Sequence, residues 1–248
     1  MDRSSETQPG IFSSALTYWR DLALRKGYPA ATLALCGALW DFLRDSTPSR
    51  LRSRFGDADY DWDHRVNTTS GAVRARDRLL GVLHSPYQPT EPALFHEMVA
   101  ALGEKANLKF EDFTFVDLGS GKGRTLLMAS DFPFRRILGV ELLPALHEIA
   151  RQNLLNYNSD SQKSFSLEAL CADATRVTLP DGPLVIYLFN PFPEAGLRRL
   201  IAHLTEILSE KARPIYILYH NPRLESVLLE SGRFRKIAAT HQYSIFSA

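Results

Sequence analysis

A glycine-rich segment between a short apolar run and a helical segment constrains this chain more than any other feature. The segment is Val116-Asp117-Leu118-Gly119-Ser120-Gly121-Lys122-Gly123-Arg124, and it overlaps the end of the apolar run Phe113–Leu118. The residues that follow it, Thr125–Ala129, have helical character. A strand, a glycine turn and a helix bring backbone N–H groups and a helix N-terminus close to a ligand, because the glycines have no Cβ. We therefore predict a ligand-binding turn of the nucleotide-binding kind.

Apolar runs and helical stripes alternate along the chain after this turn. The predicted strands are Phe113–Leu118, Arg136–Glu141, Ser166–Cys171, Leu184–Phe189 and Pro214–Tyr219. The segments after Glu141 and Pro193 carry apolar residues at i, i+3 and i+4, which is typical of helices that face a sheet. After a helix near Leu224–Ser231, a closing pair of strands is predicted at Arg235–Ala239 and Gln242–Phe246. This order predicts an α/β fold with a doubly wound, mostly parallel sheet and ligand loops at the C-terminal ends of the strands.

The N-terminal third is predicted to be a helical extension, which divides the chain into residues 1–85 and 86–248. One or two helices are predicted over Phe12–Leu43. The segment Asp57–Gly71 is predicted to be a loop, because it is rich in Asp, Asn, Ser and Thr. A helix over Ala93–Leu102 is predicted to lead into the first strand.

The balance of charges excludes a global electrostatic field. The chain has 29 Lys and Arg against 28 Asp and Glu, a net charge of +1, so nothing directs it to nucleic acid or an acidic membrane. The apolar stretch Ala30–Trp40 is only about half as long as a membrane span. Cys36 and Cys171 are predicted to be small core residues, which fits a reducing compartment. We predict a cytoplasmic protein with no membrane span.

Three classes of cofactor compete for the glycine turn. A dinucleotide fold has the pattern G-x-G-x-x-G, and Gly123 comes one position too early for it. A P-loop has the pattern G-x-x-x-x-G-K-[ST], whereas Lys122 lies inside the glycine run. The third class is S-adenosylmethionine, which carries an ammonium and a sulfonium and no phosphate. The carboxylate of Asp117 suits such a ligand and would repel a pyrophosphate, and Glu141 at a strand end can accept both ribose hydroxyls.

The pattern Asp117-x-Gly-x-Gly-x-Gly resembles the first motif of class I methyltransferases, which have a Rossmann-like fold and use S-adenosylmethionine. The resemblance covers roughly Phe113 to Ala248. It implies that Asp117 holds the amino-acid end of the cofactor, Glu141 its ribose and Asp173 the region of the adenine amino group. The implied cofactor-binding residues are Tyr87, Thr90, Asp117, Gly119, Ser120, Gly121, Gly123, Glu141, Asp173 and Asn190.

Two further segments resemble motifs of this family. Asn190-Pro191-Phe192-Pro193 differs from the N-P-P-Y motif of nucleobase methyltransferases and is more similar to the asparagine-phenylalanine motif of non-SET lysine methyltransferases. This resemblance implies that Asn190 and Phe192 are catalytic residues at the acceptor. Tyr87-Gln88-Pro89-Thr90 is similar to the segment that covers the cofactor in small lysine methyltransferases, which implies that Tyr87 packs over the cofactor and Thr90 binds its carboxylate. An ordinary turn with Thr90 as the N-cap of a helix is the alternative.

Three other features have a functional and a structural interpretation. Phe189, Phe192 and Tyr219 would form an aromatic wall for a cationic amine, or they belong to the core. His220 would deprotonate an acceptor, or it is a surface histidine. The alternating acids and aromatics of Asp59–His64 would hold a metal or form a loop with Tyr60 and Trp62 packed inward, and we predict no metal.

These expectations combine into one predicted function. The chain is predicted to be an S-adenosylmethionine-dependent methyltransferase that acts on an amine, either a protein lysine or a small molecule. A nucleobase methyltransferase, an NAD-dependent oxidoreductase and a cofactor-binding domain without catalysis remain open alternatives, because a fold does not determine a substrate.

Overall fold

The structure is a computed structural model that describes residues 19–20, 23–24, 27–29, 31–33, 36, 58–69, 89–190 and 192–248. The chain divides into two compact units, Met1–Phe55 with Gly71–Tyr87 and Gly56–Ser70 with Gln88–Ala248. In the first unit, described residues on both sides of Gly27 are helical, in agreement with the helices predicted there. The second unit contains the predicted sheet and the described residues of the candidate site.

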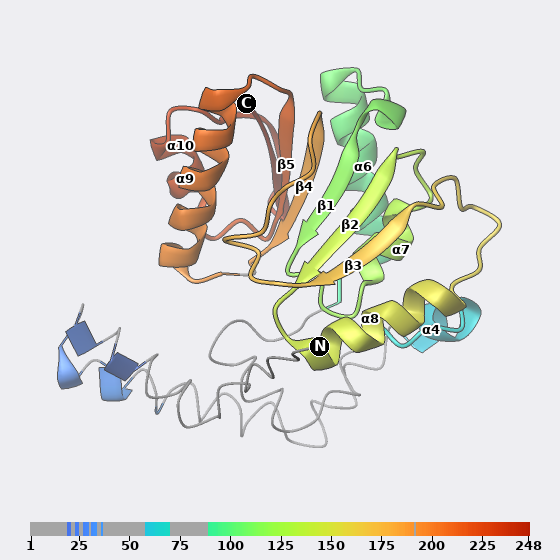
Figure 1. Ribbon diagram of the computed structural model, residues 1–248, viewed down its shortest axis with the longest axis horizontal. Helices are drawn as coiled ribbons and strands as arrows, with labels where there is room; N and C mark the ends of the chain where they lie inside the picture. The colour runs from blue at the N-terminus through green and yellow to red at the C-terminus, as the bar shows by residue number, and fades with distance from the viewer. Residues whose placement is uncertain are drawn as a thin grey trace, which may run out of the picture. The chain divides into compact units, whose positions relative to one another are not determined.

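A seven-stranded sheet forms the centre of the second unit, in the order β3-β2-β1-β4-β5-β7-β6 (Figure 1). The strands are β1 Thr114–Leu118, β2 Arg136–Glu141, β3 Leu167–Cys171, β4 Leu184–Phe189, β5 Ile215–His220, β6 Arg235–Ala239 and β7 Tyr243–Ser247. Strands β1 to β5 are parallel, and β7 is antiparallel to both β5 and β6. The doubly wound, mostly parallel sheet and its closing antiparallel pair are thus confirmed.

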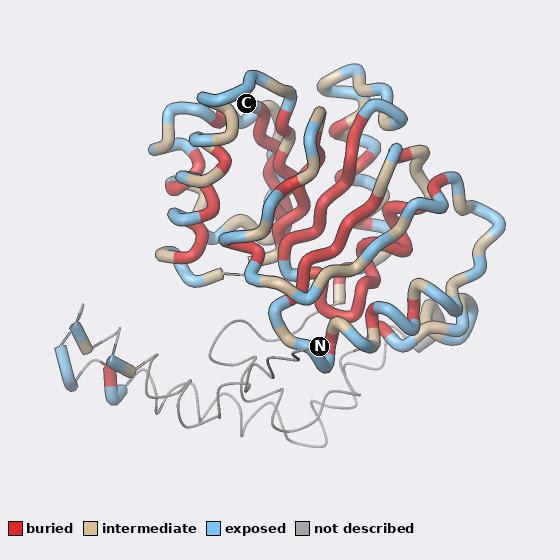
Figure 2. The backbone as a smooth tube through the Cα atoms, viewed as in Figure 1, coloured by how far each residue is buried: buried red, intermediate tan, exposed pale blue. Residues whose placement is uncertain are grey.

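The central strands β1 and β4 are buried along nearly their whole length (Figure 2). Strands covered by helices on both faces need apolar side chains on both, which explains their continuous apolar runs. The register places Leu118 beside Val140 and Phe189 beside His220. The loops that follow these four strands therefore leave the sheet at one edge, where the candidate site lies.

Helices cover both faces of the sheet. The elements are α4 Ala58–Asp63, α6 Pro92–Ala106, α7 Arg124–Ala129, α8 Pro144–Asn156, α9 Glu194–Glu210 and α10 Glu225–Glu230. One core cluster joins α6 and α7 to the sheet, and a second joins α9 and α10 to its other face (Figure 1). Helix α9 buries Leu197, Leu200 and Leu204, as its apolar stripe predicts.

Three local predictions are wrong. Part of the predicted loop Asp57–Gly71 forms helix α4, in which Trp62 is exposed rather than packed inward. Helix α6 begins at Pro92 with Glu91 as its N-cap, so Thr90 is not the N-cap. Cys36 and Cys171 are exposed, and for Cys171 the reason is its place at the end of β3, a strand at the edge of the sheet. None of the helices in the described part of the chain has the length and apolar content of a membrane span.

Candidate active site

The glycine turn has the geometry that its sequence predicts. Gly119, Gly121 and Gly123 have φ angles of 99°, 54° and 82°, in the left-handed region where other residues are strained. The N–H groups of Gly119 and Ser120 both donate to the carbonyl oxygen of Val140, at 2.8 and 3.1 Å. A Cβ on Gly123 would lie 3.2 Å from the Cβ of Ala150 in α8. The turn is therefore tight, fixed to β2 and closely packed against α8.

Asp117 is a buried carboxyl group beside this turn. The hydroxyl of Thr125, in the first turn of α7, donates a hydrogen bond to Oδ2 of Asp117. Burial raises the pKa of Asp117 to about 7; the Thr125 hydrogen bond opposes the shift and the nearby charge of Glu141 adds to it. A cationic ligand group at Asp117 would favour the ionised carboxylate, as expected of a residue that holds an ammonium.

Glu141 connects the end of β2 to the glycine turn. Its Oε2 accepts a hydrogen bond from the N–H of Gly121 and its Oε1 accepts one from the N–H of Leu143, both at 2.8 Å. Burial raises the pKa of Glu141 despite these hydrogen bonds. A carboxylate offers about four lone-pair positions, and the backbone N–H groups of Gly121, Leu142 and Leu143 all bond Glu141, so a lone pair is left for a ribose hydroxyl. This geometry fits the predicted contact with a ribose.

The side chain of Lys122 makes hydrogen bonds to other residues of the protein. Its Nζ donates to Oδ1 of Asn67 at 3.1 Å and to the carbonyl oxygen of Thr69 at 2.5 Å. In α8, the side chain of Asn153 bonds the backbone N–H and carbonyl of Asn67, at 2.8 and 3.0 Å, and the carbonyl of Lys122, at 2.8 Å. These bonds hold the segment after α4 against the glycine turn, with α4 beside α8 (Figure 1). They disfavour a P-loop, in which the lysine must reach a phosphate.

Ser120 packs against β2, and Asp173 makes hydrogen bonds within the loop after β3. The Oγ of Ser120 lies so close to Gly139 of β2 that a Cβ on that glycine would come within 2.7 Å of it. Oδ1 of Asp173 accepts hydrogen bonds from the N–H and the hydroxyl of Thr175, at 2.9 and 2.8 Å. Oδ2 of Asp173 lies 3.9 Å from Nε of Arg176, which is largely exposed. Asp173 therefore braces the loop after β3, and its contact with an adenine stays a prediction.

Asn190 is held on both sides of its amide group. It has a φ of 44°, and Asn221, at the end of the neighbouring strand, has a φ of 49°. Oδ1 of Asn190 accepts a hydrogen bond from the hydroxyl of Tyr219 at 3.1 Å, and its Nδ2 donates to the carbonyl of Asn221 at 2.6 Å. Asparagine tolerates left-handed backbone better than most residues. The amide is thereby fixed at the edge of the sheet where the glycine turn lies.

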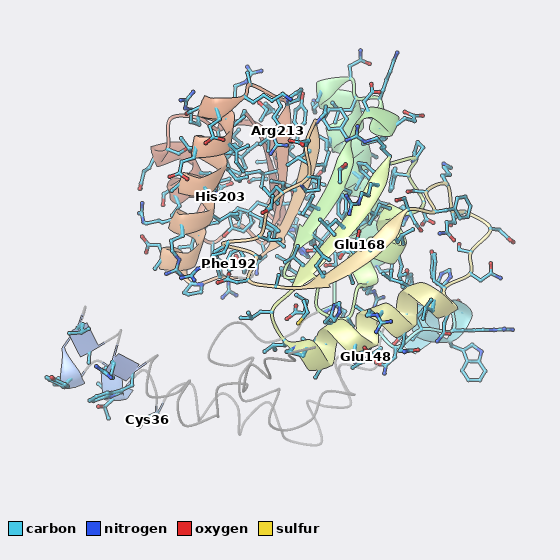
Figure 3. All side chains as sticks on the ribbon, in the orientation of Figure 1. Cys36, Glu148, Glu168, Phe192, His203 and Arg213 are labelled. Carbon is cyan, nitrogen blue, oxygen red and sulfur yellow. The ribbon has the colours of Figure 1, made fainter. Side chains whose placement is uncertain are left out.

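The three aromatic residues predicted as one wall lie on two faces of the sheet. Phe192 and Tyr219 pack in the core cluster of α9, where a Cβ on Gly196 would lie 2.9 Å from the Cβ of Phe192 (Figure 3). Phe189 packs against the opposite cluster and stacks on His220, with ring centroids 3.9 Å apart. The prediction of a single wall is therefore wrong, because alternate residues of a strand face opposite sides.

A chain of hydrogen bonds joins residues that sequence reasoning did not connect. The hydroxyl of Tyr187 lies 2.8 Å from Oγ1 of Thr90 and 2.8 Å from Nδ1 of His220. His220 is buried, so the interpretation as a surface histidine is wrong. Tyr187 was the one hint in the sequence, because a tyrosine hydroxyl in a strand buried on both faces needs a hydrogen-bond partner. Tyr87, predicted to cover the cofactor, and Pro191 lie outside the described residues.

The acids before Asn67 have a structural use. Oδ2 of Asp61 accepts hydrogen bonds from the N–H groups of Thr68 and Thr69, at 2.7 and 2.9 Å. Tyr60 lies under the guanidinium of Arg124, with 4.4 Å between the guanidinium carbon and the ring centroid. Within the part of the chain that is described, no cluster of His, Cys, Asp and Glu can hold a metal ion.

No protein-family model and no curated protein matches the sequence. Several solved structures are similar to it, among them an RNA methyltransferase from Salinibacter ruber in complex with S-adenosyl-L-homocysteine, at 19% identity over 64% of this chain and 92% of that chain, with a TM-score of 0.41. A ribosomal protein L11 methylase from Lactobacillus delbrueckii subsp. bulgaricus has 17% identity over 62% of this chain and 77% of that chain, with a TM-score of 0.41. The glycopeptide N-methyltransferase MtfA complexed with sinefungin has 14% identity over 62% of this chain and 92% of that chain, with a TM-score of 0.44.

Proposed function

We propose that this protein is an S-adenosylmethionine-dependent methyltransferase that methylates an amine, with a protein lysine as the favoured acceptor. The pair of buried carboxyl groups, Asp117 and Glu141, beside three left-handed glycines carries the proposal. Two acids suit a cofactor with an ammonium, a sulfonium and a ribose diol, and they would repel the pyrophosphate of NAD. Burial raises the pKa of both groups, and such shifts are typical of functional sites.

The residues of this chain divide the proposed work between cofactor and acceptor. When bound, S-adenosylmethionine supplies a methyl group that a nitrogen lone pair can attack. Asp117 would hold its amino-acid end, Glu141 its ribose and Asp173 its adenine, and Thr90 would bind its carboxylate. The backbone of Gly119, Ser120, Gly121 and Gly123 would allow its close approach, and Tyr87 would cover it.

The acceptor would bind at Asn190 and Phe192. The Asn190 amide has one N–H and one oxygen lone pair left after its bonds to Asn221 and Tyr219. That lone pair would accept a hydrogen bond from an amine nitrogen and align it for transfer. A nucleobase or a small-molecule amine would use the same group, so incubation with isotopically labelled cofactor and cell extract must show whether the label enters protein, nucleic acid or small molecules.

The cytoplasmic location and the domain boundary after residue 85 also stay predictions.

Calorimetric titration with S-adenosylhomocysteine tests the cofactor class. We expect micromolar binding by the wild type and binding about 1–3 kcal/mol weaker in Glu141→Ala, because a hydrogen-bonded buried charge is lost. Glu148→Gln is the matched control, since Glu148 is an exposed acid of the neighbouring helix α8 (Figure 3). Binding of NAD but not of S-adenosylhomocysteine by the folded wild type would contradict the proposal.

A further inference from the structure

We propose that His220 is a second acceptor-facing residue, whose Nε2 accepts a hydrogen bond from the nitrogen that receives the methyl group, and that Tyr187 is its positioning residue. This inference rests on the proposed methyltransferase function and extends it. It assigns roles to two buried residues for which the cofactor site has no use.

Three segments contribute to the arrangement. Thr90 precedes α6, Tyr187 lies in β4 and His220 ends β5, and all three side chains are buried. The Tyr187 hydroxyl bridges the other two, 2.8 Å from Oγ1 of Thr90 and 2.8 Å from Nδ1 of His220. Tyr187 pairs with Asp117 in the sheet, so the bridge lies beside the carboxyl group that would hold the amino-acid end of the cofactor.

Neighbouring side chains fix the imidazole of His220 and leave one of its two nitrogens available for a hydrogen bond to a ligand. The ring of Phe189 stacks on it with 3.9 Å between centroids and 21° between planes, and Tyr187 occupies Nδ1. His220 is 9% exposed, and its Nε2 has no hydrogen-bond partner among the described residues. The next residue, Asn221, binds the amide of Asn190 through its carbonyl. His220 ends β5, and Asn190 directly follows the neighbouring strand β4.

The proton count of the three groups sets the direction of their hydrogen bonds. In the proposed cofactor site, the Thr90 hydroxyl donates to the cofactor carboxylate, so its Oγ1 accepts from Tyr187. The Tyr187 oxygen then accepts from the Nδ1–H of His220, because its own single proton is already used. His220 is thereby held in the Nδ1–H tautomer with a lone pair on Nε2. Cofactor binding at Thr90 would in this way prepare the acceptor end of the site.

The charge of His220 suits this role. Burial lowers the pKa of His220 to about 4, so the ring is neutral at physiological pH. A neutral ring does not repel a sulfonium, whereas an imidazolium would. Such a weak base cannot take the proton of a lysine ammonium, whose ordinary pKa is about 10.4. His220 therefore accepts a hydrogen bond from an amine that is already neutral.

A comparison of two ligands tests the inference without a known acceptor. Sinefungin has an amine where the cofactor carries its transferable methyl group, and S-adenosylhomocysteine has nothing there. We expect wild-type protein to bind sinefungin more tightly than S-adenosylhomocysteine. In His220→Gln and Tyr187→Phe this preference should fall by about tenfold, while affinity for S-adenosylhomocysteine changes by less than about threefold. Tyr243→Phe is the matched control, because Tyr243 pairs with His220 in the sheet but its hydroxyl binds Glu97.

The outcomes separate this inference from the proposed function. An unchanged preference for sinefungin in His220→Gln overturns the role of His220 and leaves the cofactor class intact. Failure of the folded wild type to bind either ligand overturns both. Nitrogen NMR of the imidazole adds a direct reading, in which the complex with S-adenosylhomocysteine should show the Nδ1–H tautomer in the wild type and lose it in Tyr187→Phe. An Nε2–H tautomer in the wild-type complex would also overturn the inference.

Discussion

The buried environment of Asp117 favours the protonated carboxyl group, and a bound cation would favour the ionised one. Its pKa is raised to about 7, chiefly because its carboxylate loses the solvation of water. The folded state therefore binds this proton more tightly than the unfolded chain does. The contribution of Asp117 to stability is present below its ordinary pKa of 3.8 and is lost as the pH rises through about 7 in the unliganded protein.

The same shift predicts how cofactor binding depends on pH. In the proposed site, the ammonium of S-adenosylhomocysteine would pair with the ionised carboxylate, so affinity should fall by up to about tenfold per pH unit below pH 7 and level off above it. Calorimetry between pH 5.5 and 8.5 measures this profile, and buffers of different ionisation enthalpy should reveal proton release on binding near pH 6. Asp117→Asn should weaken binding and flatten the profile. A wild-type profile that is already flat would show that Asp117 does not meet the ammonium.

At the scale of elements, one side chain holds three segments together. Asn153 of α8 is buried and makes hydrogen bonds to the backbone of Asn67 and of Lys122. Its loss would leave backbone groups from the segment after α4 and from the glycine turn without these partners. The hydrogen bond to the Lys122 carbonyl is buried, and a buried group left unpaired costs about 1–3 kcal/mol. The turn therefore depends on contacts that lie far from it in the sequence.

We expect Asn153→Leu to lower the free energy of unfolding by about 1–3 kcal/mol, because the isosteric side chain leaves the buried carbonyl of Lys122 unpaired. Urea unfolding followed by circular dichroism measures the change. Gln152→Leu is the control on the same helix, since Gln152 is exposed and bonds only the exposed Glu148 among the described residues. Equal effects of the two substitutions would mean that Asn153 does not anchor the segment.

The elements differ in how far the sequence alone could predict them. The central strands were predictable because burial on both faces requires apolar runs such as Leu184–Phe189. Helix α4 was not, because six residues rarely form a helix unless tertiary contacts such as that of Tyr60 with Arg124 stabilise it. The glycine turn and the acid at Glu141 follow a local pattern. The bridge from Thr90 through Tyr187 to His220 spans separations of 97 and 33 residues, which no local pattern reports.

At the scale of the whole molecule, the balance of charges bears on the class of acceptor. The chain carries 29 basic and 28 acidic residues, a net charge of +1. A protein that neutralises six to ten phosphates loses about 10³–10⁵ in affinity between 50 and 200 mM salt. An enzyme whose acceptor is an amine on a protein or a small molecule has no need of such a basic surface.

We therefore expect weak binding to single-stranded RNA and duplex DNA, with an affinity that falls by no more than about tenfold between 50 and 200 mM salt, the loss expected for two phosphate contacts. Fluorescence anisotropy with labelled oligonucleotides, with and without S-adenosylhomocysteine, measures both values. The dependence of affinity on salt concentration separates the acceptor classes, because it reports how many phosphates the protein contacts and does not depend on the base sequence. A steep slope that appears only with bound cofactor would favour a nucleobase as the acceptor and would turn Asn190 and His220 into contacts for an exocyclic amino group.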